Sequence, residues 1–181
     1  GIRFCFVSPI KYDIAGPVKT SSVTKTTDNK NYIYHIVQKI PNNYYGYALK
    51  FANYSGTLYN SISISDIFDE KLTNIDKNKI TIVNENDLDV TKYFDISLSE
   101  VNGKTKLVAT ISSSNSDNFI SQVDFYNHTY KVNVPVTTKD KINKNKISNK
   151  ASTTVDNDTS NILESNNVDV DVYYTVTINH I

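Results

Sequence analysis

The stretch of sequence that decides the fold is NKISNKASTTV, residues 145–155. Read in steps of two, it separates into two sets of side chains, which is the periodicity of a β-strand. The less polar set is Ile147, Asn149, Ala151, Thr153 and Val155, and the more polar set is Lys146, Ser148, Lys150, Ser152 and Thr154. If the first set faces a core, the strand buries Asn149. A buried amide without a hydrogen-bond partner is costly, so a buried Asn149 needs a partner.

Similar alternating runs, separated by turn-like segments, recur along the whole chain. They are NYIYHIVQKI at 31–40, SISISDIF at 61–68, KLVATIS at 106–112, TYKVNVPV at 129–136 and VDVDV at 168–172. The Asn-Gly pair in VNGK, residues 101–104, suits a type I′ hairpin turn. No segment has an amphipathic helix pattern longer than two turns. The sequence therefore predicts an all-β protein, with an immunoglobulin-like β-sandwich as the expected architecture.

The composition narrows the class of protein. With 181 residues, of which 39% are hydrophobic, the chain is long enough for one large domain or two small ones. Its formal net charge of zero argues against a general nucleic-acid or membrane-surface binder, and no apolar run is long enough to span a bilayer. The single cysteine, Cys5, excludes an internal disulfide, which fits the cytosol or a Gram-positive surface. We expect residues 1–15 to be an N-terminal extension or a preceding strand, and residues 16–181 to form a single domain.

A second polar residue falls on an apolar face in SISISDIF. One face of that run holds Ile62, Ile64, Asp66 and Phe68, and the other holds three serines. An isolated buried carboxylate is expensive, so Asp66 would protonate, pair with a cation or bind a metal. In the alternative interpretation, Asp66 lies at a strand end and turns to solvent or caps the following turn. Asn149 likewise has the alternative of bonding to a neighbouring backbone.

The sequence pattern leaves the cation partner of Asp66 open. GPVKTSSV, residues 16–23, places Lys19 two residues after a proline, in a run that suits a first strand. Lys25 and Lys39 fit equally well by periodicity alone. The residues therefore predict an acid and an amide on core faces, without deciding which lysine meets them.

The order of several short motifs resembles that of an isopeptide-forming adhesin domain. In chain order the motifs are PVK, YIYHIVQKI, SISDIFDEKLTNI, DVTKYFDIS, YKVNVPVTTKD, ISNKAS and VDVDV. The type they resemble is the domain of Gram-positive surface adhesins related to the C-terminal region of the antigen I/II proteins. That domain is similar to the isopeptide modules of fimbriae and collagen adhesins. The resemblance extends from about residue 16 to about residue 172.

This resemblance implies a covalent bond between two side chains. In the family, a lysine on the first strand joins an asparagine on a late strand through a side-chain amide, and a nearby aspartate promotes the reaction. By the motifs, the lysine falls on Lys19, the asparagine on Asn149 and the catalytic aspartate on Asp66. Asp69 is the alternative acid, because DIFD offers two carboxylates, and Asn145 is the alternative amide.

The function implied by the resemblance is that of a structural stalk or adhesin module of a Gram-positive surface protein. We expect it to be extracellular and anchored to the cell wall, to have adjacent domains of the same protein as partners, and to need no cofactor. The alternative is an adhesin module that binds a host glycan or protein through its loops. The tyrosine-rich stretch PNNYYGYALKFANYSG, residues 41–56, is the candidate surface for such binding, since tyrosine suits recognition.

Turnover catalysis is not expected, beyond the single crosslinking event. The chain has 5 glycines, no glycine-rich phosphate loop and no nucleophile-elbow motif. Its three histidines have no metalloprotease spacing; they are His35, His128 and His180. Motif spacing predicts no metal site. The oxygen ligands of DND make Asp156 and Asp158 the candidates for calcium, with a solvated turn as the alternative.

Overall fold

The computed structural model describes residues 14–42, 59–73 and 75–174 of the chain. Within this part nearly all regular structure is β, which confirms the expected all-β class. The helical elements are short 3-10 turns: η1 (Lys77–Lys79), η2 (Thr91–Tyr93), η3 (Ser116–Ser121) and η4 (Val123–Phe125). No helix in the described part is long and apolar enough to cross a membrane.

The strands form three sheets in which one short pairing, β13 with β2, is parallel and the others are antiparallel. The first sheet runs β1 (Val18–Ser21), β3 (Asn31–Ile40), β9 (His128–Thr138) and β5 (Leu72–Thr73), and β6 (Thr81–Asn84) also pairs with β9. The second runs β12 (Leu163–Glu164), β11 (Ala151–Val155), β4 (Ser61–Phe68), β8 (Lys104–Ser112) and β7 (Asp95–Val101). The third and smallest runs β10 (Lys146–Asn149), β13 (Val168–Val172) and β2 (Lys25–Thr26).

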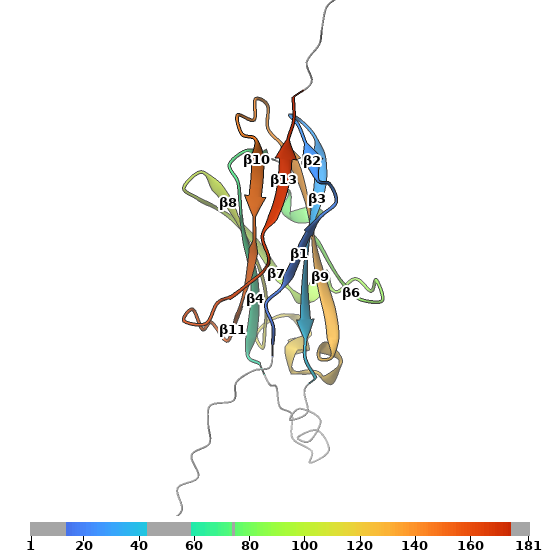
Figure 1. Ribbon diagram of the computed structural model, residues 1–181. Coiled ribbons are helices and arrows are strands. Elements are labelled where there is room, and N and C mark those ends of the chain that lie inside the picture. The colour runs from blue at the N-terminus through green and yellow to red at the C-terminus, as the bar shows by residue number, and fades with distance from the viewer. Residues whose placement is uncertain (1–13, 43–58, 74, 175–181) are drawn as a thin grey trace, which may run out of the picture.

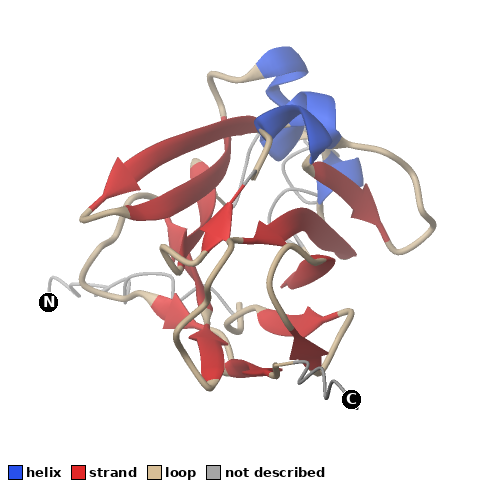
Figure 2. Ribbon diagram, turned by 90° about the horizontal axis from the view of Figure 1, so that it is seen from above, coloured by secondary structure: helices blue, strands red, loops and turns tan. Residues whose placement is uncertain are grey.

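The long strands of the first two sheets bury one face each, and these faces form the core of a β-sandwich (Figure 1). The core-facing side chains of β3 and β4 include Tyr32, Tyr34, Ile36, Ile62, Ile64 and Phe68, as the alternation predicts. Burying each such large apolar side chain stabilises the fold by about 1.5–3 kcal/mol. Seen from above, the strands surround this core and the short helical turns gather on one side (Figure 2). The expected immunoglobulin-like sandwich is thus confirmed.

Residues 145–155 form two strands instead of the single strand that their alternation suggests. β10 ends at Asn149 and pairs with β13, whereas β11 begins at Ala151 and pairs with β4. Lys150 alone separates them. The alternation continues through the break, because the whole less polar set is buried: Ile147, Asn149, Ala151, Thr153 and Val155. The segment therefore passes from the third sheet to the second without turning Asn149 out of the interior.

The described chain enters and leaves the sandwich at opposite ends of its long axis. In Figure 1 the segment leading into β1 comes from the lower end, and β13 leaves at the upper end. Cys5, His180 and residues 43–56 of the tyrosine-rich stretch lie outside the described residues. Ligand binding through that stretch therefore stays a prediction.

Candidate crosslinking site

Lys19 is a buried lysine on the first strand. Alternation along β1 leaves Val18 55% exposed and Lys19 only 1% exposed. The Lys19 ammonium nitrogen lies 4.3 Å from the centroid of the Tyr34 ring and 4.9 Å from that of the Phe68 ring. Aromatic faces attract a cation, but they replace only part of the hydration that burial removes. The Lys19 charge therefore needs an anion close by.

Asp66 supplies that anion from the opposite sheet. It lies on β4, where the alternation directs it inward and leaves it 2% exposed. Lys19 Nζ donates a hydrogen bond to Asp66 Oδ2, and both side chains are fully buried. The other carboxylate oxygen, Asp66 Oδ1, has no hydrogen-bond partner. The pair thus bridges the two sheets and leaves one acceptor oxygen unused.

Asn149 brings a buried carboxamide to the same place. Asn149 is the last residue of β10, and Ala151, two residues later, is paired directly with Asp66. Asp66 and Asn149 also line the same pocket, so the two groups are close. Asn149 Nδ2 donates to the backbone oxygen of Ile67 at 2.9 Å, whereas Asn149 Oδ1 has no partner. The amide is therefore held by its nitrogen while its carbonyl oxygen lacks a donor.

Burial shifts the pKa values of the acid and the amine toward each other. Loss of hydration raises the pKa of the Asp66 carboxyl to about 6, although the neighbouring Lys19 charge opposes the shift. Loss of hydration likewise lowers the pKa of the Lys19 amine to about 8, against the opposing effect of Asp66. Moving one proton from Lys19 to Asp66 therefore costs much less here than it would in water.

The aromatic wall of the site is a feature that the sequence interpretation did not identify. Tyr34 and Phe68 cover the Lys19 ammonium, and the Tyr34 hydroxyl lies 2.9 Å from that of Tyr32. Burial raises the pKa of both tyrosines, so both hydroxyls stay neutral. The alternation already placed these rings on core faces, but nothing in the sequence pattern placed them against a lysine.

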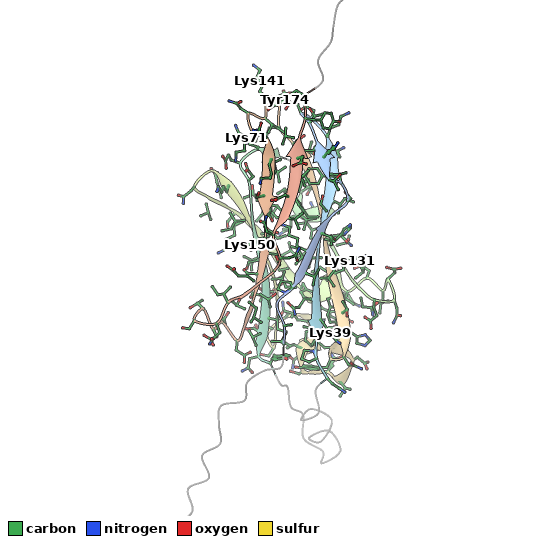
Figure 3. The ribbon with its side chains drawn as sticks, in the orientation of Figure 1. Lys39, Lys71, Lys131, Lys141, Lys150 and Tyr174 are labelled. Atoms are coloured by element: carbon green, nitrogen blue, oxygen red, sulfur yellow. The ribbon has the colours of Figure 1, made fainter. Side chains whose placement is uncertain are left out.

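The alternative residues lie elsewhere. Lys25 and Lys39 are exposed, and Lys39 projects at the lower end of the sandwich in Figure 3. Asn145 is exposed as well. Asp69 is half-buried, accepts the Lys71 backbone N–H at 2.8 Å and pairs with a different lysine, Lys144. Within the described part of the chain, Lys19, Asp66 and Asn149 are thus the set that the fold brings together.

The two candidate calcium ligands hold turns. Asp156 Oδ1 accepts the backbone N–H groups of Asn60 and Ser61 at 2.7 and 3.1 Å. Asp158 accepts the backbone N–H of Ser160 at 3.1 Å and the side-chain amide of Asn161 at 2.7 Å. Among the described residues no group of three or more His, Cys, Asp or Glu side chains is arranged to hold a metal ion. Calcium binding at these aspartates stays an untested prediction.

Several solved structures have a similar fold. The major pilin SpaA of Corynebacterium diphtheriae matches with a TM-score of 0.65 and 17% identity, over 86% of this chain and 38% of that chain. The C-terminal domain of the antigen I/II-family protein AspA of Streptococcus pyogenes matches with a TM-score of 0.57 and 12% identity, over 86% and 46%. The C-terminal domain of the antigen I/II polypeptide BspA of Streptococcus agalactiae matches with a TM-score of 0.57 and 12% identity, over 88% and 49%. This chain thus spans less than half of each.

Sequence comparison identifies the family. No curated protein sequence matches significantly. Residues 17–172, which cover most of the chain and include Lys19, Asp66 and Asn149, match the family described as the cell surface antigen I/II C2 terminal domain. The match begins just before β1 and ends with β13, so it spans the whole described sandwich. The chain therefore belongs to the family of the cell surface antigen I/II C2 terminal domain.

Proposed function

We propose that this domain is a structural stalk module of a Gram-positive surface adhesin, locked by an intramolecular isopeptide bond between Lys19 and Asn149. The observation that carries the proposal is the fully buried Lys19–Asp66 pair beside a buried carboxamide. Membership of a cell-surface antigen family supports it. The structure of the similar pilin SpaA points to a modular pilus assembly with stabilizing isopeptide bonds in that protein.

The reaction begins with a proton transfer inside the Lys19–Asp66 hydrogen bond. It produces a neutral amine, which is a nucleophile, and a neutral carboxylic acid, which is a hydrogen-bond donor. At this site, Asp66 Oδ1 and Asn149 Oδ1 are buried oxygens without a hydrogen-bond partner. A proton on Asp66 Oδ1 would give that oxygen a hydrogen to donate to Asn149 Oδ1. That hydrogen bond would polarise the carboxamide carbonyl for attack.

In the bond-forming step, Lys19 Nζ attacks Asn149 Cγ. The new Nζ–Cγ bond forms, the Cγ–Nδ2 bond breaks, and Asp66 carries protons from the attacking nitrogen to the departing one. One neutral ammonia leaves, and Asp66, which gives up one proton and receives another, ends as the neutral acid that the initial proton transfer produced. Folding supplies the proximity of the groups, and each domain reacts once, so no turnover and no cofactor are involved.

The product removes an energetic problem. A buried ion pair loses hydration that its mutual attraction repays only in part, whereas the amide that replaces the Lys19 amine is neutral. The new bond also closes a loop of 130 residues, which is 149 minus 19. By the chain-entropy relation for crosslinks, a loop of that length stabilises the fold by about 5 kcal/mol.

A stalk role follows from where the chain enters and leaves. Because the two ends of the described chain lie at opposite ends of the sandwich (Figure 1), force applied through adjacent domains runs along the long axis. The proposed partners are therefore the preceding and following domains of one surface protein. The proposed location is the outer face of the cell wall.

Intact-mass spectrometry tests the proposal. The folded wild-type protein should be lighter than its calculated mass by one ammonia, without any partner enzyme. Lys19→Ala, Asn149→Ala and Asp66→Ala should each restore the full calculated mass of the variant. Asn145→Ala is the matched control, because Asn145 is an exposed amide near the same strand, and it should keep the deficit. A wild-type mass equal to the calculated value, or a deficit that survives Asn149→Ala, would contradict the proposal.

A further inference from the structure

The backbone of Lys19 is held by an asparagine side chain far away in the sequence. Asn166 Oδ1 accepts the Lys19 backbone N–H at 2.8 Å, and Asn166 Nδ2 donates to the Lys19 backbone oxygen at 2.9 Å. β1 is the terminal strand of its sheet, paired with β3 on one side. On its other side, the Asn166 amide makes the two bonds that a neighbouring strand would otherwise make.

The residue before Asn166 holds the start of β11, the strand that follows the other reactant, Asn149. Ser165 N–H donates to the Ala151 backbone oxygen at 2.8 Å, and the Ala151 N–H donates to Ser165 Oγ at 2.8 Å. Ala151 lies two residues after Asn149. Beyond Asn166 the same segment enters β13, where Val168 is the register partner of Asn149. One short segment therefore contacts both reacting strands.

A glycine lets the chain entering β1 lie directly against this segment. A Cβ atom built on Gly16 would be 2.4 Å from the backbone oxygen of Glu164, which is too close for any side chain. Gly16 precedes Lys19 by three residues, and Glu164 immediately precedes Ser165. This contact is independent of the Asn166 hydrogen bonds, and it brings together the same two parts of the chain.

We propose that Ser165 and Asn166 form a clasp that sets the distance between Lys19 and Asn149, with Asn166 as the main positioning residue for crosslinking. The inference rests on the proposed function. Some contact must fix the position of β1 relative to β10, since these strands belong to different sheets and no β-ladder in the described part of the chain joins them. The reaction requires the attacking nitrogen to be held near the amide carbon, and small displacements of aligned groups cost about 10²-fold in rate.

The test follows crosslinking in refolding chains. Unreacted protein comprising residues 1–181, purified in denaturant from inclusion bodies, is refolded by dilution. Intact mass gives the rate of ammonia loss, and circular dichroism gives the rate and extent of folding. We expect Asn166→Ala to slow ammonia loss from folded chains by about ten- to a hundredfold. The matched control is Asn167→Ala, because the Asn167 side chain is exposed and donates to Asp169; it should react at the wild-type rate.

Two further variants keep the test decisive if Asn166→Ala folds poorly. Asn166→Asp retains an acceptor for the Lys19 N–H and loses the donor, so it should react more slowly than the wild type and faster than Asn166→Ala. Gly16→Ala leaves Asn166 intact, but it pushes the chain away from Glu164 and should also slow the reaction. A wild-type rate per folded chain in Asn166→Asp and Gly16→Ala would overturn the clasp. Absence of ammonia loss in the wild type would instead overturn the proposed function.

Discussion

The sharpest mechanical prediction concerns how far the domain lengthens when it is pulled. Lys19→Ala removes the amine of the proposed bond, so no covalent link between residues 19 and 149 could bypass the chain between them. In the crosslinked protein, force passes from Lys19 directly to Asn149. Only the residues before 19 and after 149 can then extend between the points of attachment.

The size of the difference follows from the length of the closed loop. The bypassed segment spans 130 residue-to-residue steps, from 19 to 149. An extended chain spans about 3.3–3.6 Å per residue, so releasing this segment adds roughly 430–470 Å of length. The folded end-to-end distance is common to both proteins, and it cancels in the comparison. Lys19→Ala should therefore lengthen by that amount beyond the wild type on complete unfolding.

Single-molecule force spectroscopy, with the domain held between reference modules, measures this length directly. Asn149→Ala should give the same gain as Lys19→Ala, because either change prevents the bond. Lys25→Ala is the control, since Lys25 is an exposed lysine on β2, and it should extend like the wild type. The reasoning would be refuted if wild-type domains released the full length, or if Lys19→Ala gave no additional length.

Two other predictions follow from the buried groups. The rate of ammonia loss from refolded chains should be greatest between about pH 6 and pH 8, because only the form in which Lys19 and Asp66 share one proton reacts. Below this pH range both groups are protonated, and above it both have lost their protons. A rate that rises steadily to pH 10 would contradict the role of Asp66 as an acid. Thr153→Val should lower the free energy of unfolding by about 1–3 kcal/mol, because the buried Thr153 hydroxyl donates to Gln38 Oε1 at 2.7 Å. Thr154→Val, on the outer face of the same strand, should change it little in denaturant titrations.

Alternation alone placed two members of the candidate site correctly on core faces. Asp66 and Asn149 each interrupt an apolar face of a strand in the sequence, and both are buried in the structure. The signal works because the β-strand period of two is strict, so a polar residue on the wrong face is conspicuous. The same rule placed Tyr34 and Phe68 inward. It could not show that all four surround one point, since that depends on how two sheets are packed.

The alternation of side chains along a strand could not identify Lys19 or the clasp residues. β1 has only four residues, so its alternation is too short to separate Lys19 from other lysines; the family resemblance was needed to choose it. Asn166 is 147 residues from Lys19 in sequence, and its hydrogen bonds go to backbone atoms, which every residue has. A polar residue in a loop between strands gives no sign of such a partner.

The geometry of the site also explains why a domain would keep three polar side chains in its core. Before reaction, Lys19 and Asp66 are a fully buried ion pair, and one oxygen of Asp66 and one of Asn149 lack donors. As a permanent arrangement this costs stability, and well-packed apolar residues would serve better. The same features are what the proposed crosslinking chemistry requires: shifted pKa values, an acid close to the amide, and burial of the reacting groups. If the proposed bond forms, this instability is confined to the time between folding and bond formation, and the proposed clasp at Ser165 and Asn166 would keep that time short.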